Sequence, residues 1–180
     1  LIKKLQNIMR GDDLSGTVQY LKQMIWMIFL KIYDAQEEKW ELLEDDYTSI
    51  IPEELKWRNW AVDNNDGKAL TGDELIKFVN DTLIMGLKKL EVNEYTPKRH
   101  LIVWQMFQDA SNFMKNGTKL RQMINELNQK DFTNSTETHE FGDMYESMLK
   151  DLQESKRDGG EFYTPRALTD FIVEKVDPCL

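Results

Sequence analysis

The chain has 180 residues, of which 41% are hydrophobic and 31% are charged, with only four prolines and nine glycines. This length and composition suit a folded domain with a sizeable core and exclude a largely disordered chain. The formal net charge of −9 argues against a chain that wraps a nucleic-acid backbone by itself, because such binding needs lysine and arginine side chains.

Two helices are predicted at the start of the chain. Leu1, Leu5 and Met9 recur at helical spacing and Gly11 follows them, which predicts a short amphipathic helix that packs on the next helix. Residues 17–34 are apolar on almost every side, which is typical of a buried central helix. Methionine and aromatic stripes of this kind usually form a core, so we assign this helix no chemistry.

A strongly acidic segment, residues 36–46, follows the central helix. Charge runs are usually solvated, so we predict the exposed end of a helix and a loop; an acidic partner-binding or metal-binding surface is the less favoured alternative. Pro52 then opens a short turn that contains Trp57 and Trp60. These side chains would share one helical face and could stack on bases, but the neighbouring carboxylates favour packing in the core.

The loop from Asp63 to Gly67 has the composition of a calcium-binding loop but not its spacing. With Gly67 at the sixth loop position, the first ligand would be Val62. With Asp63 at the first position, the place that requires glycine holds Lys68. We therefore predict a turn-rich loop without calcium.

Thr71 and Glu74 form a capping-box pattern, which predicts the start of the next helix. The apolar residues that follow share one helical face. We expect the core to receive Leu75, Phe78, Val79, Leu83, Leu87 and Leu90.

Two more helices are predicted before residue 132. Residues 100–115 have a helical pattern, and Asn116 and Gly117 are typical of a helix end. Thr118 would then cap the following helix. The residues expected in the core are Leu101, Val103, Trp104, Phe107 and Met114 in the first helix, and Leu120, Ile124 and Leu127 in the second.

The last 48 residues begin with a polar loop, residues 133–138. Residues 141–152 then show a clean amphipathic pattern, which predicts a helix, and residues 150–158 form a charged connector. No strand pattern, internal repeat or low-complexity tract interrupts the chain. The predicted fold class is all-α.

A glycine pair and a helix start stand together near the end of the chain. Gly159 and Gly160 allow free turning of the backbone, while Thr164 and Pro165 suit the N-cap and first position of a helix that runs to Val176. The unsatisfied N–H groups at such a helix start attract a carboxylate or a phosphate. On spacing alone, an ordinary capped helix after a glycine loop explains the same pattern.

The residues GEFYTPR, from Gly160 to Arg166, resemble the first cofactor-contacting motif of DNA adenine-N6 methyltransferases, specifically of the modification (M) subunit of type I restriction-modification enzymes. Residues 142–146 resemble the family's Gly-Asp-hydrophobic-Tyr-Glu pattern, and residues 20–34 resemble its first conserved helix. The resemblance implies an N-terminal helical bundle domain at residues 1–157. Residues 158–180 would form the connector and the first cofactor-motif helix, which leads into a catalytic α/β domain.

The resemblance also implies a site for S-adenosylmethionine. Its contacts would be Glu161, Phe162, Tyr163, Thr164, Pro165 and Arg166. The aromatic rings would supply packing surface, and Thr164 with nearby N–H groups would donate to the methionine carboxylate. The family's glycine-rich loop and its Asn-Pro-Pro-aromatic motif have no counterpart before Leu180, so no catalytic residue is assigned and this fragment alone is expected to be inactive.

The implied partners are those of the family. They are a specificity (S) subunit, a second M subunit, a restriction subunit in the full complex, and double-stranded DNA bound through the assembly. The flipping of an adenine out of the base stack would belong to the longer parent. Because the chain begins with Leu1 rather than methionine, we expect it to be part of a longer polypeptide.

Other chemistries receive little support from the sequence. His100, His139 and the single cysteine, Cys179, are too scattered for a metal site, and no nucleophile elbow or phosphate-binding loop is present. One cysteine favours a reducing, cytoplasmic location. The longest apolar run, residues 24–30, is far below the roughly 20 residues that span a membrane, and residues 1–10 lack a signal-peptide pattern.

Two alternatives stay open at the level of sequence. The first is a stand-alone acidic helical module that binds a protein partner through an apolar patch and has no enzymatic role. The second is an independent DNA-binding domain, which the net charge disfavours. A basic patch of Lys88, Lys89, Lys98 and Arg99 would support the second if the fold made it contiguous.

Overall fold

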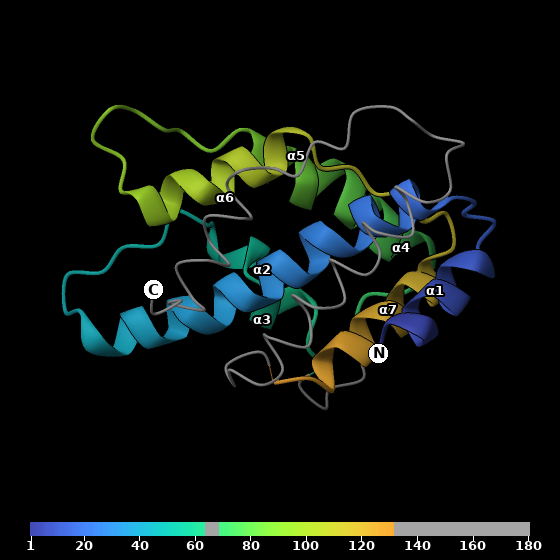
Figure 1. The fold of residues 1–180 in the computed structure, drawn as a ribbon. Coiled ribbons are helices and arrows are strands. Elements are labelled where there is room, and N and C mark those ends of the chain that lie inside the picture. The colour runs from blue at the N-terminus through green and yellow to red at the C-terminus, as the bar shows by residue number, and fades with distance from the viewer. Residues whose placement is uncertain (64–68, 132–180) are drawn as a thin grey trace, which may run out of the picture.

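The described part of the chain is helical. The structure is a computed structural model that describes residues 1–63 and 69–131, and this part contains no strand, which confirms the predicted all-α class. Its elements (Figure 1) are α1 (Ile2–Arg10), α2 (Thr17–Leu43), η1 (Glu53–Leu55), α3 (Trp57–Trp60), α4 (Gly72–Lys77), η2 (Phe78–Ile84), α5 (Met85–Lys88), α6 (Lys98–Gln108) and α7 (Gly117–Asn128).

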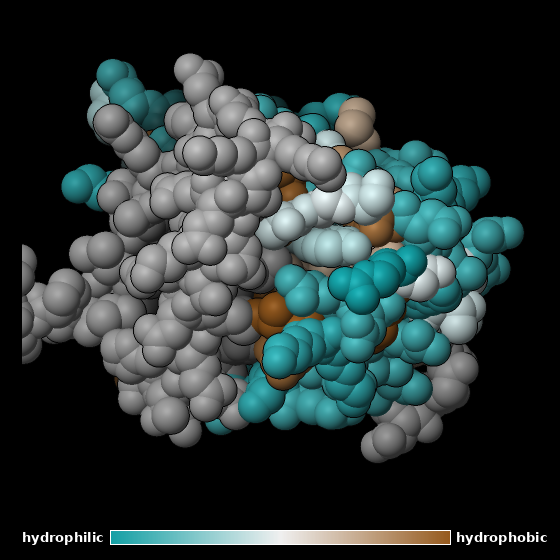
Figure 2. All heavy atoms as spheres, turned by 45° about the vertical axis from the view of Figure 1, so that its right-hand side comes forward, coloured by the Kyte–Doolittle hydropathy of each residue, from teal (hydrophilic) through white to brown (hydrophobic). Residues whose placement is uncertain are grey.

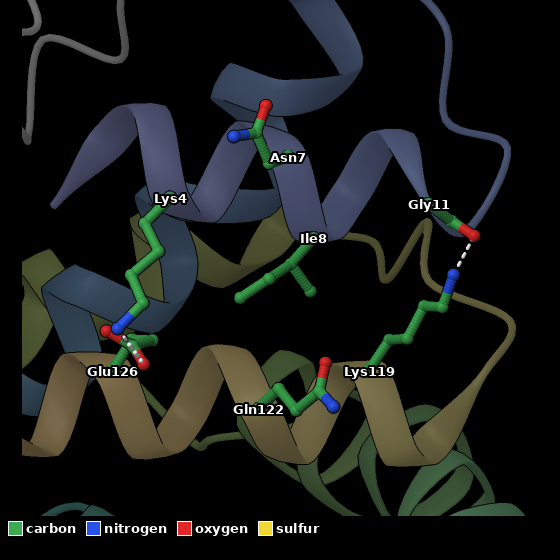
Figure 3. Close-up of a pocket in the computed structure, with 7 residues that line it drawn as sticks. All are labelled: Lys4, Asn7, Ile8, Gly11, Lys119, Gln122 and Glu126. Atoms are coloured by element: carbon green, nitrogen blue, oxygen red, sulfur yellow. Dashed lines mark hydrogen bonds and ion pairs between the residues drawn. The ribbon is translucent and has the colours of Figure 1, made fainter.

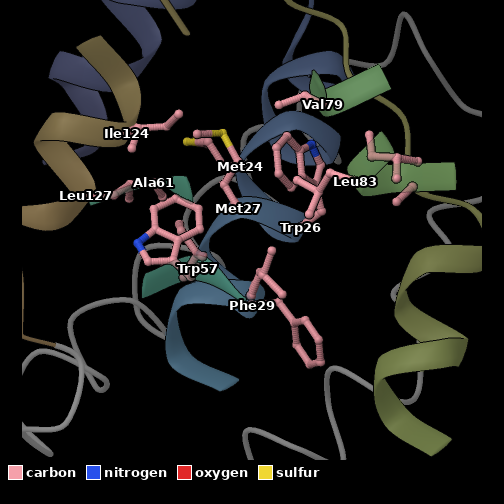
Figure 4. Packing of buried hydrophobic residues seen from close by; sticks show 14 of the residues in the cluster. Met24, Trp26, Met27, Phe29, Trp57, Ala61, Val79, Leu83, Ile124 and Leu127 are labelled. Carbon is pink, nitrogen blue, oxygen red and sulfur yellow. The ribbon is translucent and has the colours of Figure 1, made fainter. Parts of the chain in front are cut away.

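Helix α2 is the centre of the fold, and the other helices surround it (Figure 1). The prediction of a buried central helix is confirmed, although α2 has 27 residues and continues to Leu43. Figure 4 shows how its side chains meet those of other elements. The labelled residues from α2 are Met24, Trp26, Met27 and Phe29, and those around them are Trp57, Ala61, Val79, Leu83, Ile124 and Leu127.

Helix α1 packs chiefly against α7, so the two ends of the described chain lie side by side (Figure 1). The N-terminal helix was correctly predicted, and Leu5 and Met9 are fully buried. Its chief partner is thus α7, whereas the sequence predicted the next helix, α2. Residues 11–16 contain a turn and a bend, with positive φ angles at Asp13 and Gly16, that redirect the chain before α2 begins.

Elements α4, η2 and α5 follow one another without a break, as the predicted single helix requires. Leu75, Val79, Leu83 and Leu87 are fully buried, as predicted. These residues recur every four positions, which exceeds the 3.6 residues of an α-helical turn. The wider π-helical turns of η2 keep such a pattern on one face. Thr71 is the N-cap, but its side chain accepts no capping hydrogen bond, so the capping box does not form.

Helix α6 ends at Gln108, whereas the sequence predicted a helix to residue 115, so this prediction is wrong. Side chains satisfy the backbone N–H groups that a longer helix would have used. The N–H of Phe113 donates to Gln23 Oε1 at 2.7 Å, and that of Lys115 donates to Asp12 Oδ2 at 2.7 Å. Residues 110–116 therefore cross the molecule as an irregular segment held by α2 and by the α1–α2 connection.

Asn116 and Gly117 begin α7 rather than end the preceding helix, and Thr118 is not its cap. The side chain of Asn116 accepts from the N–H of Lys119 at 3.1 Å and is the N-cap. Gly117 lies directly against the backbone of Gly72: a Cβ atom at residue 117 would stand 1.8 Å from the Gly72 carbonyl oxygen. The predicted burial of Leu120, Ile124 and Leu127 is confirmed.

Several predicted segments lie outside the described residues. They are most of the calcium-like loop, the polar loop at 133–138, the helix at 141–152, the connector at 150–158 and the segment 159–176.

Candidate functional site

The six residues predicted to contact a cofactor lie outside the described residues. They are Glu161, Phe162, Tyr163, Thr164, Pro165 and Arg166, and their roles stay predictions.

Trp57 and Trp60 belong to the core, which confirms the favoured interpretation of this pair. Their rings lie 5.1 Å apart between centroids and both residues are buried. Each indole nitrogen is already used: Trp57 donates to Asn128 Oδ1 at 2.8 Å and Trp60 donates to the Leu55 carbonyl at 3.2 Å. Neither ring is free to stack on a base.

The basic patch predicted from Lys88, Lys89, Lys98 and Arg99 is not contiguous. The side chain of Gln108, at the end of α6, donates to the Lys88 carbonyl at 3.2 Å. Arg99 lies nine residues earlier in the same helix, which is about 13 Å along its axis. The structure therefore separates the two halves of the patch.

Arg99 is also occupied by other groups. Its Nη1 and Nη2 donate to the two carboxylate oxygens of Glu44, each at 2.7 Å. The guanidinium carbon lies 5.2 Å from the Trp40 ring centroid and 4.8 Å from that of Tyr47, which are cation–π distances. This side chain therefore ties the start of α6 to the end of α2, and a phosphate would have to compete with Glu44 for it.

Two carboxylates of α2, Asp34 and Glu37, are buried, which the sequence analysis missed. The prediction that residues 36–46 are solvated is wrong for Glu37, whose side chain is 0% exposed. Asp34, Glu37 and Glu41 recur at i, i+3 and i+7, so they share one helical face. This spacing of carboxylates, followed in the sequence by Lys56 and Arg58, is the pattern from which a buried ion-pair cluster could have been predicted.

Glu37 receives hydrogen bonds and opposite charges from the segment after α2. Tyr47 and Ser49 donate their hydroxyls to its Oε1 at 2.8 and 2.6 Å. Its Oε2 lies 3.7 Å from Arg58 Nη2 and 4.0 Å from Lys56 Nζ. Both basic groups also contact Glu41, at 2.7 and 2.9 Å. This cluster of buried charges fastens residues 47–58 onto α2.

The carboxyl group of Asp34 makes the stability of the folded state depend on pH. Burial raises the pKa of its carboxyl from 3.8 to about 6; Arg58 opposes this increase, and Glu38 and Glu37 add to it. The folded state therefore binds a proton that the unfolded state has released between about pH 4 and 6. Stability from this proton is fully present below pH 4 and is lost as the pH rises through 6.

We expect Asp34→Asn to remove this dependence. Between pH 4 and 7 the difference in unfolding free energy between the variant and the parent chain should change by roughly 3 kcal/mol. Denaturant titrations at several pH values measure it. Asp45→Asn, at an exposed position, is the control and should leave the pH profile unchanged. A profile that Asp34→Asn also leaves unchanged would contradict the raised pKa.

A groove of about 530 Å³ runs between α1 and α7 (Figure 3). The helices are antiparallel along it. At one end Lys4 and Glu126 form an ion pair at 2.7 Å, and at the other end Lys119 Nζ donates to the Gly11 carbonyl. Ile8 points from α1 towards α7, while Asn7 lies on the side of α1 away from α7 (Figure 3). Ile8 is the one apolar side chain among the seven residues that line the groove.

Arg121 lines a second groove, of about 570 Å³, but its role is structural. Its guanidinium donates to three main-chain carbonyls: Leu70 at 2.7 Å, Ala61 at 2.8 Å and Trp60 at 3.4 Å. These contacts hold together the two stretches of chain on either side of residues 64–68. The buried charge is thus already solvated by the backbone.

The described residues contain no group of three or more histidine, cysteine, aspartate or glutamate side chains arranged to hold a metal ion. Within the same ranges, 1–63 and 69–131, no helix is long and apolar enough to cross a membrane.

Comparison with known families gives two matches in succession along the chain. Residues 1–127 match the family described as HsdM N-terminal domain, and residues 136–179 match N-6 DNA Methylase. The first match covers all of the described helices up to the last turn of α7.

The relatives are methylase subunits of type I restriction enzymes. The chain is 52% identical over its whole length to the Type I restriction enzyme EcoEI methylase subunit of Escherichia coli and spans 36% of that protein. It is 24% identical to the EcoKI methylase subunit of Escherichia coli K12, over 88% of this chain and 26% of that protein. The chain thus spans about a third or less of these relatives.

Solved structures share the fold. A modification subunit of a putative type I restriction enzyme from Vibrio vulnificus YJ016 superposes with a TM-score of 0.73 and 32% identity, covering 98% of this chain and 39% of that one. A second solved structure, which concerns complex assembly and conformational transition of the type I R-M system, superposes with a TM-score of 0.74 and 34% identity. The match covers 98% of this chain and 34% of that one.

Proposed function

This chain belongs to the HsdM N-terminal domain family, and from that premise we propose that its parent polypeptide is a type I restriction-modification DNA adenine-N6 methyltransferase subunit. One observation carries the proposal: an HsdM N-terminal match is followed in the same chain by an N-6 DNA Methylase match. The described helices are the body of the N-terminal domain, and the enzymatic activity belongs to the longer parent.

We divide the chain into a helical domain, residues 1–157, and a connector with the first cofactor-motif helix, residues 158–180. In the parent, S-adenosylmethionine supplies the methyl group that is transferred to the adenine amine. Residues 161–166 bind and orient this cofactor: Phe162 and Tyr163 pack against it, and Thr164 with the N–H groups of the helix start donates to its carboxylate. Glu161 and Arg166 flank these contacts.

The proposal predicts that Thr164→Val combined with Pro165→Ala weakens cofactor binding by the full-length parent. Loss of a hydrogen bond and of the preset helix start should lower the affinity roughly 3- to 10-fold, while the helical domain stays folded. Isothermal titration calorimetry with S-adenosylmethionine measures the effect. Thr118→Val, an exposed substitution on α7, is the matched control. Equal affinities in both variants would contradict the cofactor site.

The proposed partners follow from the same assignment. They are a specificity subunit, a second M subunit, a restriction subunit in the full complex, and double-stranded DNA reached through that assembly. A substrate of this kind is met in the cytoplasm of a bacterial cell, where we place the parent. The relatives give no support to the alternative of a stand-alone acidic interaction module without enzymatic role.

A further inference from the structure

The most exposed large apolar side chains of the described residues lie at one end of the molecule. Leu42 and Leu43, in the last turn of α2, are 85% and 81% exposed, and Tyr95, in the connection between α5 and α6, is 85% exposed. No other large apolar residue in the described ranges exceeds 44%. Single exposed leucines are common on folded proteins, but three such side chains at one end indicate a binding surface.

An ion pair joins the two segments that carry these side chains. Glu44 directly follows Leu43, and Arg99 lies four residues beyond Tyr95. Nη1 and Nη2 of Arg99 donate to the two carboxylate oxygens of Glu44, each at 2.7 Å. The end of α2 and the connection between α5 and α6 lie at the same end of the molecule, on the left in Figure 1. We call this end the α2-end surface, and its apolar residues are Leu42, Leu43 and Tyr95.

Local hydrogen bonds fix the backbone that presents Tyr95. The N–H of Asn93 donates to Thr96 Oγ1 at 2.8 Å, and the N–H of Tyr95 donates to Asn93 Oδ1 at 2.9 Å. Leu42 and Leu43 belong to a helix, so their backbone is fixed as well. A surface that is ordered before binding loses little conformational entropy when a partner docks. Tyrosine is also among the residues that contribute most to protein–protein affinity.

The rim of the α2-end surface is acidic. Residues 41–48 and 91–97 contain six acidic residues and no basic residue, and all six are exposed: Glu41, Glu44, Asp45, Asp46, Glu91 and Glu94. Glu41 and Glu44 have basic partners within the chain, whereas no basic group of the described residues lies within 4.0 Å of the other four carboxylates. Unpaired carboxylates around apolar side chains repel a nucleic-acid backbone and attract lysine or arginine.

The size of this apolar cluster favours a reversible contact. Three side chains form a small patch, whereas obligate subunit interfaces are large and more apolar. An apolar centre with a charged rim is typical of partners that bind and separate. The opposite side of the molecule differs in character: Figure 2 brings the right-hand side of Figure 1 forward, and the described residues there are mainly hydrophilic.

We propose that the α2-end surface docks a segment of a partner protein in which apolar side chains are flanked by lysine or arginine. The apolar side chains of that segment cover Leu42, Leu43 and Tyr95, and its basic groups pair with the free carboxylates of the rim. This inference rests on the proposed function, because it assigns a docking surface for a subunit of the parent's assembly. A reversible contact suits the subunit that is present only in the full complex, the restriction subunit.

The test measures binding of the purified restriction subunit to the full-length parent assembled with its specificity subunit. Surface plasmon resonance gives the affinity at several salt concentrations. The triple variant Leu42→Gln, Leu43→Gln, Tyr95→Ser should bind about 10- to 100-fold more weakly, because it removes three exposed anchors. The charge-reversal variant Asp45→Lys, Glu94→Lys should bind about 10-fold more weakly at low salt and depend less on salt.

The matched control replaces exposed apolar side chains elsewhere, Val62→Thr and Met85→Gln, and should bind like the parent. An unchanged affinity in the triple variant, or an equal loss in the control, overturns the inference. Tighter binding by the charge-reversal variant also overturns it, because the partner segment would then be acidic. A triple variant that fails to assemble with the specificity subunit, or that loses only self-association in sedimentation velocity, overturns it as well, since the surface would then belong to another subunit contact.

The behaviour of the unaltered parent separates this inference from the proposed function. If the parent binds neither S-adenosylmethionine in calorimetry nor its specificity and restriction subunits, the proposed function fails. If the parent binds all three and the triple variant keeps full affinity for the restriction subunit, only the docking role of the α2-end surface fails. Thermal melting curves show that each variant is folded.

Discussion

Gly117→Ala is expected to lower the free energy of unfolding by about 3 kcal/mol or more, because the new methyl group has no space. Its Cβ would lie 1.8 Å from the carbonyl oxygen, 2.4 Å from the carbonyl carbon and 2.8 Å from the Cα of Gly72. All three atoms belong to the backbone, which a rotamer change cannot move. Gly72 has a φ of +57°, so its own conformation resists displacement as well.

Denaturant unfolding of the two proteins measures this difference. Gly86→Ala is the matched control, because its Cβ would meet only the tip of the Leu55 side chain, at 2.7 Å. That tip can rotate away, and alanine is favoured over glycine in a helix, so the control should stay within about 1 kcal/mol of the parent. Similar stabilities for both variants would show that α7 does not need this contact.

Glu37→Ala is expected to lower the free energy of unfolding by about 2–4 kcal/mol, chiefly because two buried hydroxyls lose their acceptor. The substitution removes the acceptor for the hydroxyls of Tyr47 and Ser49 and an opposite charge near Lys56 and Arg58, which keep their closer contacts with Glu41. Lys56 is itself buried, so its ammonium group cannot recover full hydration. The unfolding should begin with the detachment of residues 47–58 from α2.

Glu38→Ala provides the comparison, one residue further along the same helix. The Glu38 side chain is 55% exposed and lies 3.5 Å from Arg58 Nη1, a surface ion pair that contributes less than about 1 kcal/mol. Chemical denaturation of both variants, with hydrogen exchange at residues 47–58, distinguishes them. If both substitutions cost less than about 1 kcal/mol, the buried cluster would contribute little to stability.

Periodicity was sufficient to predict most of the helices and the core. The central helix, the burial of Leu75 to Leu87 at every fourth position and the apolar face of α7 all follow from local sequence. Such patterns are reliable because each residue's environment repeats with the helical turn. The predicted capping box failed at Thr71, since its hydroxyl accepts no hydrogen bond from the helix start.

The sequence predictions were wrong where residues far away in the sequence determine the local structure. The early end of α6 depends on Gln23 and Asp12, which accept hydrogen bonds from the N–H groups of residues 113, 115 and 116. Neither acceptor can be recognised from a window around residue 113. Gly117, read as a helix end, is instead required by the approach of Gly72, 45 positions earlier.

The candidate functional residues also include some that a local pattern predicts and others that depend on distant parts of the chain. The cofactor motif at residues 161–166 is a local pattern, and its contacts stay predictions. The basic patch expected around Lys88 and Arg99 is divided by the length of α6, and Glu44 neutralises Arg99. The pairing of α1 with α7 could not be predicted, because the two helices stand at opposite ends of the described domain.

The pairing of α1 with α7 also determines when the domain can be completed during synthesis. About 110 residues separate the two helices, and a ribosome that adds roughly 5–20 residues per second needs about 5–20 s to translate them. During that interval α1 lacks the helix against which it chiefly packs. The first helix made is thus among the last to complete its packing in the domain.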